Sequence, residues 1–157
     1  MAIDINGIAH LYITVQDMGV CRPFYERLLG LFGMTCLVDT PELYYCIGGR
    51  TGIGIRAATR EHRNTVFDQY RAGLHHVCFR ARSREDVDAA AAFVAEEGAA
   101  IIHAPQEDGW AAGYYSVLFE DPCGTRLEVN YVPGKGNLDP SVRRPLARTT
   151  QGRLSET

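Results

Sequence analysis

The stretch GIAHLYITV, residues 7–15, returns later in the chain as GLHHVCFRA, residues 73–81. The two stretches align without a gap, so that His10 corresponds to His76. Apolar residues stand at every second position in both, which is typical of a β-strand with one buried face. Such similarity within one chain indicates a duplicated structural unit.

The residues that follow each stretch continue the parallel. Helix-starting residues come first, then an amphipathic helical segment, then a glycine suited to a helix end, and then three strand-like segments. The helices are expected over 18–29 and 84–97, with starts at Asp17 and Ser83 and ends at Gly30 and Gly98; the strands are expected over 35–38, 43–47, 51–55, 100–103, 114–118 and 125–129. We therefore predict an α+β fold of two tandem βαβββ modules that form a curved half-barrel with the helices outside.

The chain organisation follows from this repeat. We predict a single domain over residues 1–134, with module one over about 5–59 and module two over about 73–133. A polar connector, 60–72, joins the modules, and residues 135–157 have the composition of a polar C-terminal tail.

Composition excludes several classes of function. Hydrophobic residues at 46% and charged residues at 22% are ordinary for a soluble globular protein. No apolar run is long enough to span a membrane, and the N-terminus lacks a secretory pattern. A net charge of −3 argues against nucleic acid as a partner. The five scattered cysteines contain no CxxC and are expected to be reduced thiols in the cytoplasm.

Strand alternation selects three candidate metal ligands. The apolar positions of each first strand must lie against a helix, which leaves His10 and His76 on the concave face. The same rule on the last strand places Glu128 there, and it prefers His76 over its neighbour His75. Two imidazoles and one carboxylate are a common ligand set for Fe, and they also serve Mn, Zn, Ni or Co. We therefore predict one divalent metal ion held by these three residues.

Further side chains on or near the concave face are candidates for contact with a small-molecule substrate. Trp110 lies in a loop that module one lacks, with glycines at both ends, and the loop could act as a lid or simply pack on a neighbouring surface. Alternation does not decide whether Tyr114 or Tyr115 faces the cleft, and the arginines could instead form structural salt bridges. The candidate set is Tyr12, Arg80, Trp110, Tyr115, Arg126 and Asn130.

The segments HLYITVQD, FYERLLGLFG and YYSVLFEDPCGTRLEV resemble the vicinal oxygen chelate superfamily over about residues 5–133. This superfamily includes glyoxalase I, bleomycin-resistance proteins, fosfomycin-modifying enzymes and extradiol dioxygenases. The resemblance implies a metal held by a histidine at the start of each module and a glutamate on the last strand, here His10, His76 and Glu128. It also implies a homodimer, which in some members completes each cleft with a module from the partner.

Two positions depart from the better-known branches. Glyoxalase I enzymes carry a fourth, carboxylate ligand where the repeat alignment puts Gly54, and extradiol dioxygenases usually carry a catalytic tyrosine where this chain has Leu118. Both activities are therefore disfavoured in their usual form. We also expect Gly54 to leave room for a bulkier substrate.

These observations predict a metal-dependent enzyme of lyase, isomerase or dioxygenase type. The ion would chelate two neighbouring oxygens of a small oxygenated substrate. One alternative is a non-catalytic protein that binds a drug or metabolite and so confers resistance. Another is a transferase that adds a thiol or water to an epoxide.

Overall fold

The computed structural model describes residues 3–5 and 7–134. The first module consists of β1 (His10–Val15), α1 (Met18–Leu31), β2 (Thr35–Asp39), β3 (Leu43–Gly48) and β4 (Thr51–Ala57). The second consists of β5 (Val77–Arg80), α2 (Arg84–Glu96), β6 (Ile101–Glu107), β7 (Tyr115–Glu120) and β8 (Arg126–Tyr131). The predicted α+β fold of two tandem βαβββ modules is confirmed. The predicted tail, 135–157, lies outside the described residues.

Both helices begin where side-chain capping was expected. The Asp17 carboxylate accepts the backbone N–H of Gly19 at 2.7 Å, ahead of α1. The Ser83 hydroxyl accepts the backbone N–H of Asp86 at 3.1 Å, ahead of α2. Each contact satisfies a backbone donor that has no partner within the helix, which stabilises the first turn.

The end of α1 differs from the prediction. The helix continues through Gly30, and the left-handed position is taken by Gly33, with φ of 69°. Backbone hydrogen bonds close the helix at this second glycine, since the N–H of Gly33 donates to Gly30 and the N–H of Met34 donates to Leu29, each at 2.9 Å. Gly98, after α2, has φ of 70° and occupies its predicted place. Both helices therefore end at a glycine in the left-handed conformation, and α1 uses the second of the two glycines near its end, Gly33 rather than Gly30.

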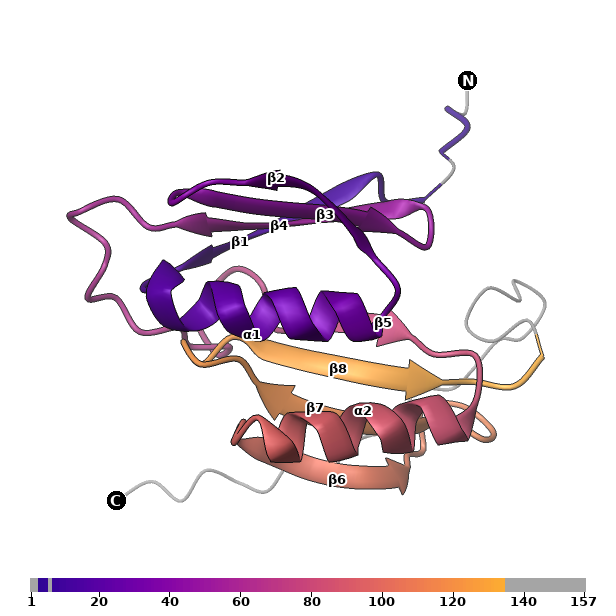
Figure 1. Ribbon diagram of the computed structural model, residues 1–157. Coiled ribbons are helices and arrows are strands. Elements are labelled where there is room, and N and C mark those ends of the chain that lie inside the picture. The colour runs from indigo at the N-terminus through magenta and orange to yellow at the C-terminus, as the bar shows by residue number, and fades with distance from the viewer. Residues whose placement is uncertain (1–2, 6, 135–157) are drawn as a thin grey trace, which may run out of the picture.

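Each module forms its own four-stranded sheet. The strand orders are β1-β4-β3-β2 and β5-β8-β7-β6. The first strand of each module pairs in parallel with the last one, β1 with β4 and β5 with β8, and the remaining pairs are antiparallel. In this register His10 lies opposite Gly52, and Cys78 lies opposite Glu128. Neither sheet closes into a barrel, since each has two free edge strands, β1 and β2 in one and β5 and β6 in the other (Figure 1).

Helix α1 lies between the two sheets, and α2 covers the sheet of module two (Figure 1). One continuous core joins both modules. Its helical members are Cys21, Phe24, Tyr25, Leu28 and Leu29 from α1 and Val87, Ala90, Ala91 and Val94 from α2. Burial of this apolar surface is the main contribution to the stability of the fold.

Each sheet buries the face that is turned toward the helices. In β1, Ile13 and Val15 are buried, whereas His10, Tyr12 and Thr14 are exposed. We call the face opposite the helices the open face of each sheet. Because both sheets bury the side that meets α1, their two open faces point away from that helix. This arrangement decides which side chains can meet within one chain.

Among the described residues, no helix is long and apolar enough to cross a membrane. The segment between β4 and β5, which contains the predicted connector 60–72, forms turns and holds no helix or strand. It carries the chain from one sheet to the other.

Candidate functional site

A histidine and a glutamate pair on the open face of module two. Nε2 of His76 lies 3.0 Å from Oε2 of Glu128. His76 directly precedes β5, and Glu128 lies on the neighbouring parallel strand β8. Glu128 is only 7% exposed, whereas its partner is half-buried. A carboxylate this well shielded needs polar partners, and the imidazole is one of them.

The second partner of Glu128 is Tyr114, whose hydroxyl donates to Oε1 at 2.5 Å. Burial raises the pKa of the Glu128 carboxyl, but the hydrogen bonds with His76 and Tyr114 outweigh it and bring the pKa below its ordinary value. Burial, together with the bond to Glu128, raises the pKa of Tyr114, so its phenol remains a donor. One oxygen of the carboxylate is thus held by a phenol and the other by an imidazole.

The two adjacent histidines contact each other. Nδ1 of His75 lies 2.7 Å from Nδ1 of His76, so one of the two rings donates to the other. Of the pair, it is His76 that faces Glu128, in the manner that strand alternation predicts. A second contact on the far nitrogen is the usual way in which the orientation of a ligating imidazole is set.

Other polar groups line the same open face. Ser116 is fully buried and donates to Asp108 at 3.2 Å, and it lies opposite Asn130 in the register of β7 and β8. Asn130 is 5% exposed. Arg80 is exposed and lies opposite Asn130 on the other side of β8. These residues surround the His76–Glu128 pair with hydrogen-bonding groups.

The structure locates three further residues of the predicted substrate-binding set, and it corrects one of them. Tyr115 faces the helix, where its hydroxyl donates to Asp88 of α2 at 2.8 Å, so the open-face tyrosine is Tyr114. Arg126 is paired with Glu120 at 3.4 Å, which is the structural salt bridge considered above. Trp110 is 50% exposed in the β6–β7 loop.

The open face of module one carries an aromatic surface. His10 meets Tyr12 edge-on at 5.5 Å between ring centroids, and Tyr12 stacks with Tyr45 at 5.7 Å and an interplanar angle of 17°. The two tyrosine rings lie over β4, where a Cβ on Gly54 would come within 2.4 Å of Tyr12, and a Cβ on Gly52 within 2.0 Å of Tyr45. Gly54 therefore makes room for the Tyr12 ring, and the expectation that it leaves space for substrate is wrong.

The three predicted metal ligands do not form one cluster within the chain. Over residues 3–5 and 7–134, no three histidine, cysteine, aspartate or glutamate side chains are placed to hold a metal ion. His76 and Glu128 form a pair on module two, while His10 lies on the open face of module one. The opposed directions of the two open faces are the physical reason for this separation.

Sequence reasoning left Tyr114 undecided and did not single out Tyr45 or Ser116. A usable signal was present for Tyr114. Val117 and Phe119 are both apolar and both fully buried, so their parity puts Tyr115 on the helix side and Tyr114 on the open face. Tyr45 depended on the register that places it opposite Gly54, which only the folded sheet defines.

The similarity of the chain to a known protein family agrees with this duplicated fold. Residues 7–129 match the family model described as the Glyoxalase/Bleomycin resistance protein/Dioxygenase superfamily. The chain therefore belongs to this superfamily. No curated protein matches the chain.

Solved structures share the fold at low sequence identity. A protein from Bacillus halodurans is 24% identical with a TM-score of 0.73, over 81% of this chain and 96% of that one. A glyoxylase/bleomycin resistance protein/dioxygenase domain from Frankia sp. EAN1pec is 24% identical with a TM-score of 0.67, over 82% and 98%. The lactoylglutathione lyase from Agrobacterium tumefaciens is 20% identical with a TM-score of 0.58, over 81% and 94%. At this level of identity the similarity shows the fold alone.

Proposed function

We propose that this chain is a metal-dependent enzyme of lyase, isomerase or dioxygenase type that acts on a small oxygenated substrate in the cytoplasm. The observation that carries the proposal is the His76–Glu128 pair, whose carboxylate is 7% exposed and is held by Tyr114. An ionised carboxylate and an imidazole side by side on an open sheet face are suitable donors for Fe, Mn, Zn, Ni or Co. Two donors are too few for a stable site, so a third is required.

We propose that the third donor is His10 of a second copy, which makes the functional unit a homodimer. His10 is exposed and starts β1, as His76 immediately precedes β5, so it occupies the repeat-equivalent position on the other module. The open face of module one also exposes apolar surface, with Tyr12 at 44% and Ile47 at 42%. Exposed apolar groups that are contiguous on one face favour contact with a partner. Pairing the open face of module one with that of module two from another copy would bring all three donors together.

The metal ion and the side chains around the His76–Glu128 pair have distinct roles in this proposal. A divalent ion held there would supply Lewis-acid chemistry, polarising two neighbouring oxygens of the substrate. Tyr114 fixes the direction of the Glu128 carboxylate, and His75 contacts the far nitrogen of His76. Asn130 and Arg80, on the same face, are proposed to bind substrate oxygens.

A binding protein without catalysis is the second candidate, and the stacked Tyr12 and Tyr45 favour it. These rings present an aromatic surface on which a planar drug or metabolite could lie. Tight binding of an aromatic compound by metal-free protein, reduced by Tyr12→Ala and unchanged by Glu128→Ala, would select this candidate. An epoxide transferase has less support. A transferase for an epoxide that carries an acidic group would need unpaired cations on the open face, and Arg126 is paired with Glu120.

Metal content tests the leading proposal. The full chain is purified anaerobically, loaded in turn with Fe(II), Mn, Zn, Ni and Co, desalted and analysed for bound metal. We expect about one ion per chain for at least one metal, and loss of that ion in His10→Ala, His76→Ala and Glu128→Ala. His62→Ala is the matched control, since its ring is exposed and lies outside the proposed set. The proposal fails if no metal is retained, or if the three variants retain as much metal as the control.

A further inference from the structure

Two cysteines from different modules meet at the boundary between them. Sγ of Cys21 lies 2.8 Å from Sγ of Cys123, and the two residues are 102 positions apart in the chain. Cys21 is on α1 and has no exposed surface, while Cys123 is half-buried in the turn between β7 and β8. This separation is only about 0.8 Å longer than a disulfide bond of about 2.05 Å.

The backbone around this contact is held by several hydrogen bonds. Tyr25, one helical turn after Cys21, donates its hydroxyl to Asp121 at 2.7 Å. The other carboxylate oxygen of Asp121 accepts the backbone N–H groups of Cys123 and Thr125, each at 2.8 Å. The Tyr25–Asp121 bond therefore holds the turn against α1, and the two backbone bonds fix the shape of the turn around Cys123. The two sulfurs approach each other because α1 and the β7–β8 turn are held together in this way.

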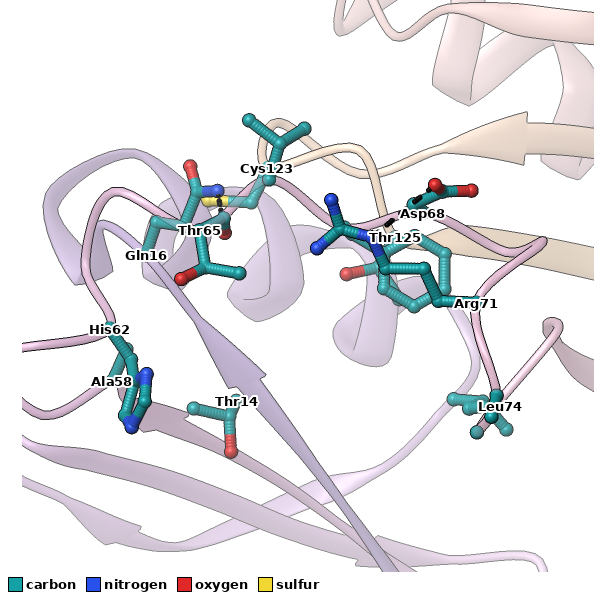
Figure 2. Close-up of a pocket in the computed structure, with 14 residues that line it drawn as sticks. Thr14, Gln16, Ala58, His62, Thr65, Asp68, Arg71, Leu74, Cys123 and Thr125 are labelled. Atoms are coloured by element: carbon teal, nitrogen blue, oxygen red, sulfur yellow. Dashed lines mark hydrogen bonds and ion pairs between the residues drawn. The ribbon is translucent and has the colours of Figure 1, made fainter.

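One of the two sulfurs can be reached from solvent. Cys123 lines a cavity of about 320 Å³ between the end of β1, the segment after β4 and the β7–β8 turn. Figure 2 shows Cys123 at one side of this cavity, beside Gln16 and Thr65. Cys21 lies behind it in the core. A small oxidant that enters the cavity meets Cys123 first.

We propose that Cys21 and Cys123 form a reversible disulfide when a hydroperoxide oxidises Cys123. The Cys123 sulfur attacks the peroxide O–O bond, forming a sulfenic acid and releasing water or an alcohol. The Cys21 thiol then attacks that sulfenic sulfur, and its proton leaves with the second oxygen as water. The two sulfurs lose two electrons in total, and the peroxide gains them. Reduction by a dithiol reverses the change.

The order of attack agrees with the chemistry of the two thiols. Burial raises the pKa of the Cys21 thiol, so it stays protonated at neutral pH and does not begin the reaction. Oxidation of this kind, transient and reversible, is also the form of disulfide that suits a reducing compartment. The inference does not depend on the proposed metal site, because neither sulfur contacts His76 or Glu128 in the structure.

A second pair of neighbouring cysteines in the protein serves as a control. Cys36 and Cys46 lie opposite each other in the register of β2 and β3, the first exposed and the second buried. Trypsin should separate the two cases, since Cys36 and Cys46 share the peptide 28–50, whereas Cys21 and Cys123 lie on peptides 1–27 and 85–126. Only the proposed disulfide therefore joins two peptides of those masses.

The test uses the full chain, reduced and then treated with a few equivalents of hydrogen peroxide. Free thiols are blocked with N-ethylmaleimide after denaturation, and the digest is analysed by mass spectrometry. We expect peptide 1–27 joined to peptide 85–126, with release by dithiothreitol. The same product should form in Cys36→Ala and be absent from Cys123→Ala and Cys123→Ser.

A second measurement follows the thermal unfolding of the same samples. A bridge that closes so long a loop should raise Tm by roughly 5 to 15 °C in the oxidised protein, and dithiothreitol should abolish the rise. Cys123→Ser should show no such rise. The proposal is overturned if Cys21 and Cys123 are both recovered as blocked thiols while Cys36 or Cys78 is oxidised. It is equally overturned if Cys123 passes to its sulfinic acid without forming the joined peptide.

Discussion

The hydroxyl of Tyr114 donates to Oε1 of Glu128 at 2.5 Å, so a phenol on the residue just before β7 sets the direction of a carboxylate on β8. Tyr114 is 8% exposed and lies on the open face beside a buried, ionised group. Removing such a partner leaves the carboxylate with one hydrogen bond fewer in a site where water has little access. The consequences of this contact can be measured.

Tyr114→Phe should weaken binding of the metal by about 10- to 100-fold, the usual cost of removing a partner that orients a ligand. The reason is that Glu128 would be free to rotate away from His76. Competition with a chelating dye measures the affinity. Tyr115→Phe is the matched control, since that hydroxyl bonds Asp88 on the helix side and should leave metal binding unchanged. Equal effects of the two substitutions would contradict the assigned role of Tyr114.

Mixing two inactive variants tests whether the site is shared between copies. His10→Ala and Glu128→Ala should each fail to retain metal alone. If two chains form each site, random reassociation of the variants should restore about a quarter of the wild-type content, because half of the dimers are mixed and each has one intact site of two. Metal analysis after co-refolding provides the readout. No recovery, with mixed dimers demonstrated by a tag on one variant, would place the site elsewhere.

Gly54→Ala should destabilise the protein by about 1 kcal/mol, because the added Cβ would lie 2.4 Å from Tyr12 and would displace its ring from Tyr45. In a Tyr12→Ala background the same substitution should have almost no effect. Denaturant unfolding of the four proteins in this cycle gives the coupling energy. Additive effects would show that the Tyr12 ring does not depend on the glycine.

Gly30→Ala should stabilise the protein by about 0.5–1 kcal/mol. The residue lies within α1, and a Cβ there would meet nothing within 4 Å, so alanine lowers the entropy of the unfolded chain at no steric cost. Gly33→Ala should instead destabilise by about 1–2 kcal/mol, since φ at that residue is 69°. Thermal unfolding of the two variants checks both signs. A stabilising Gly33→Ala would contradict the helix end described for α1.

The buried phenol of Tyr25 makes stability depend on alkaline pH. Burial, with the neighbouring Asp121, raises the pKa of this phenol well above 10. In the unfolded chain it ionises near 10, so stability is complete below about pH 10 and falls as pH rises between the unfolded and folded pKa values. Tyr25→Phe should lower stability at neutral pH by about 1–3 kcal/mol, since Asp121 loses a donor.

The same variant should show a shallower loss of stability above pH 10, by up to about 1.4 kcal/mol per pH unit relative to wild type. Denaturant unfolding at several pH values between 8 and 11 measures the two slopes, and other tyrosines and cysteines cancel in the comparison. Parallel curves would indicate that Tyr25 ionises in the folded protein as it does in the unfolded one.

Local signals in the sequence were sufficient to predict the helices and strands, and to predict which face of most strands is buried. The capping residues Asp17 and Ser83 were found because capping depends on neighbours within one turn. The placement of His76, rather than His75, toward Glu128 followed from a period of two, which the pleat of a strand enforces. Gly30 was the wrong choice of helix end, because Gly33 offers the same local signal three residues later and is the glycine that adopts the positive φ.

The sequence by itself determined the duplication, the α+β class, the superfamily and the set of residues that faces away from the helices. These follow from periodicity and from motifs, both of which are written in the order of residues. Only the tertiary structure decided that α1 lies between the two sheets and that the open faces consequently point apart. It thereby separated His10 from the His76–Glu128 pair, filled the space at Gly54 with the Tyr12 ring, and brought Cys21 to Cys123. The physical reason is that the mutual packing of two modules depends on the whole core they share, and no local pattern of the chain encodes its direction.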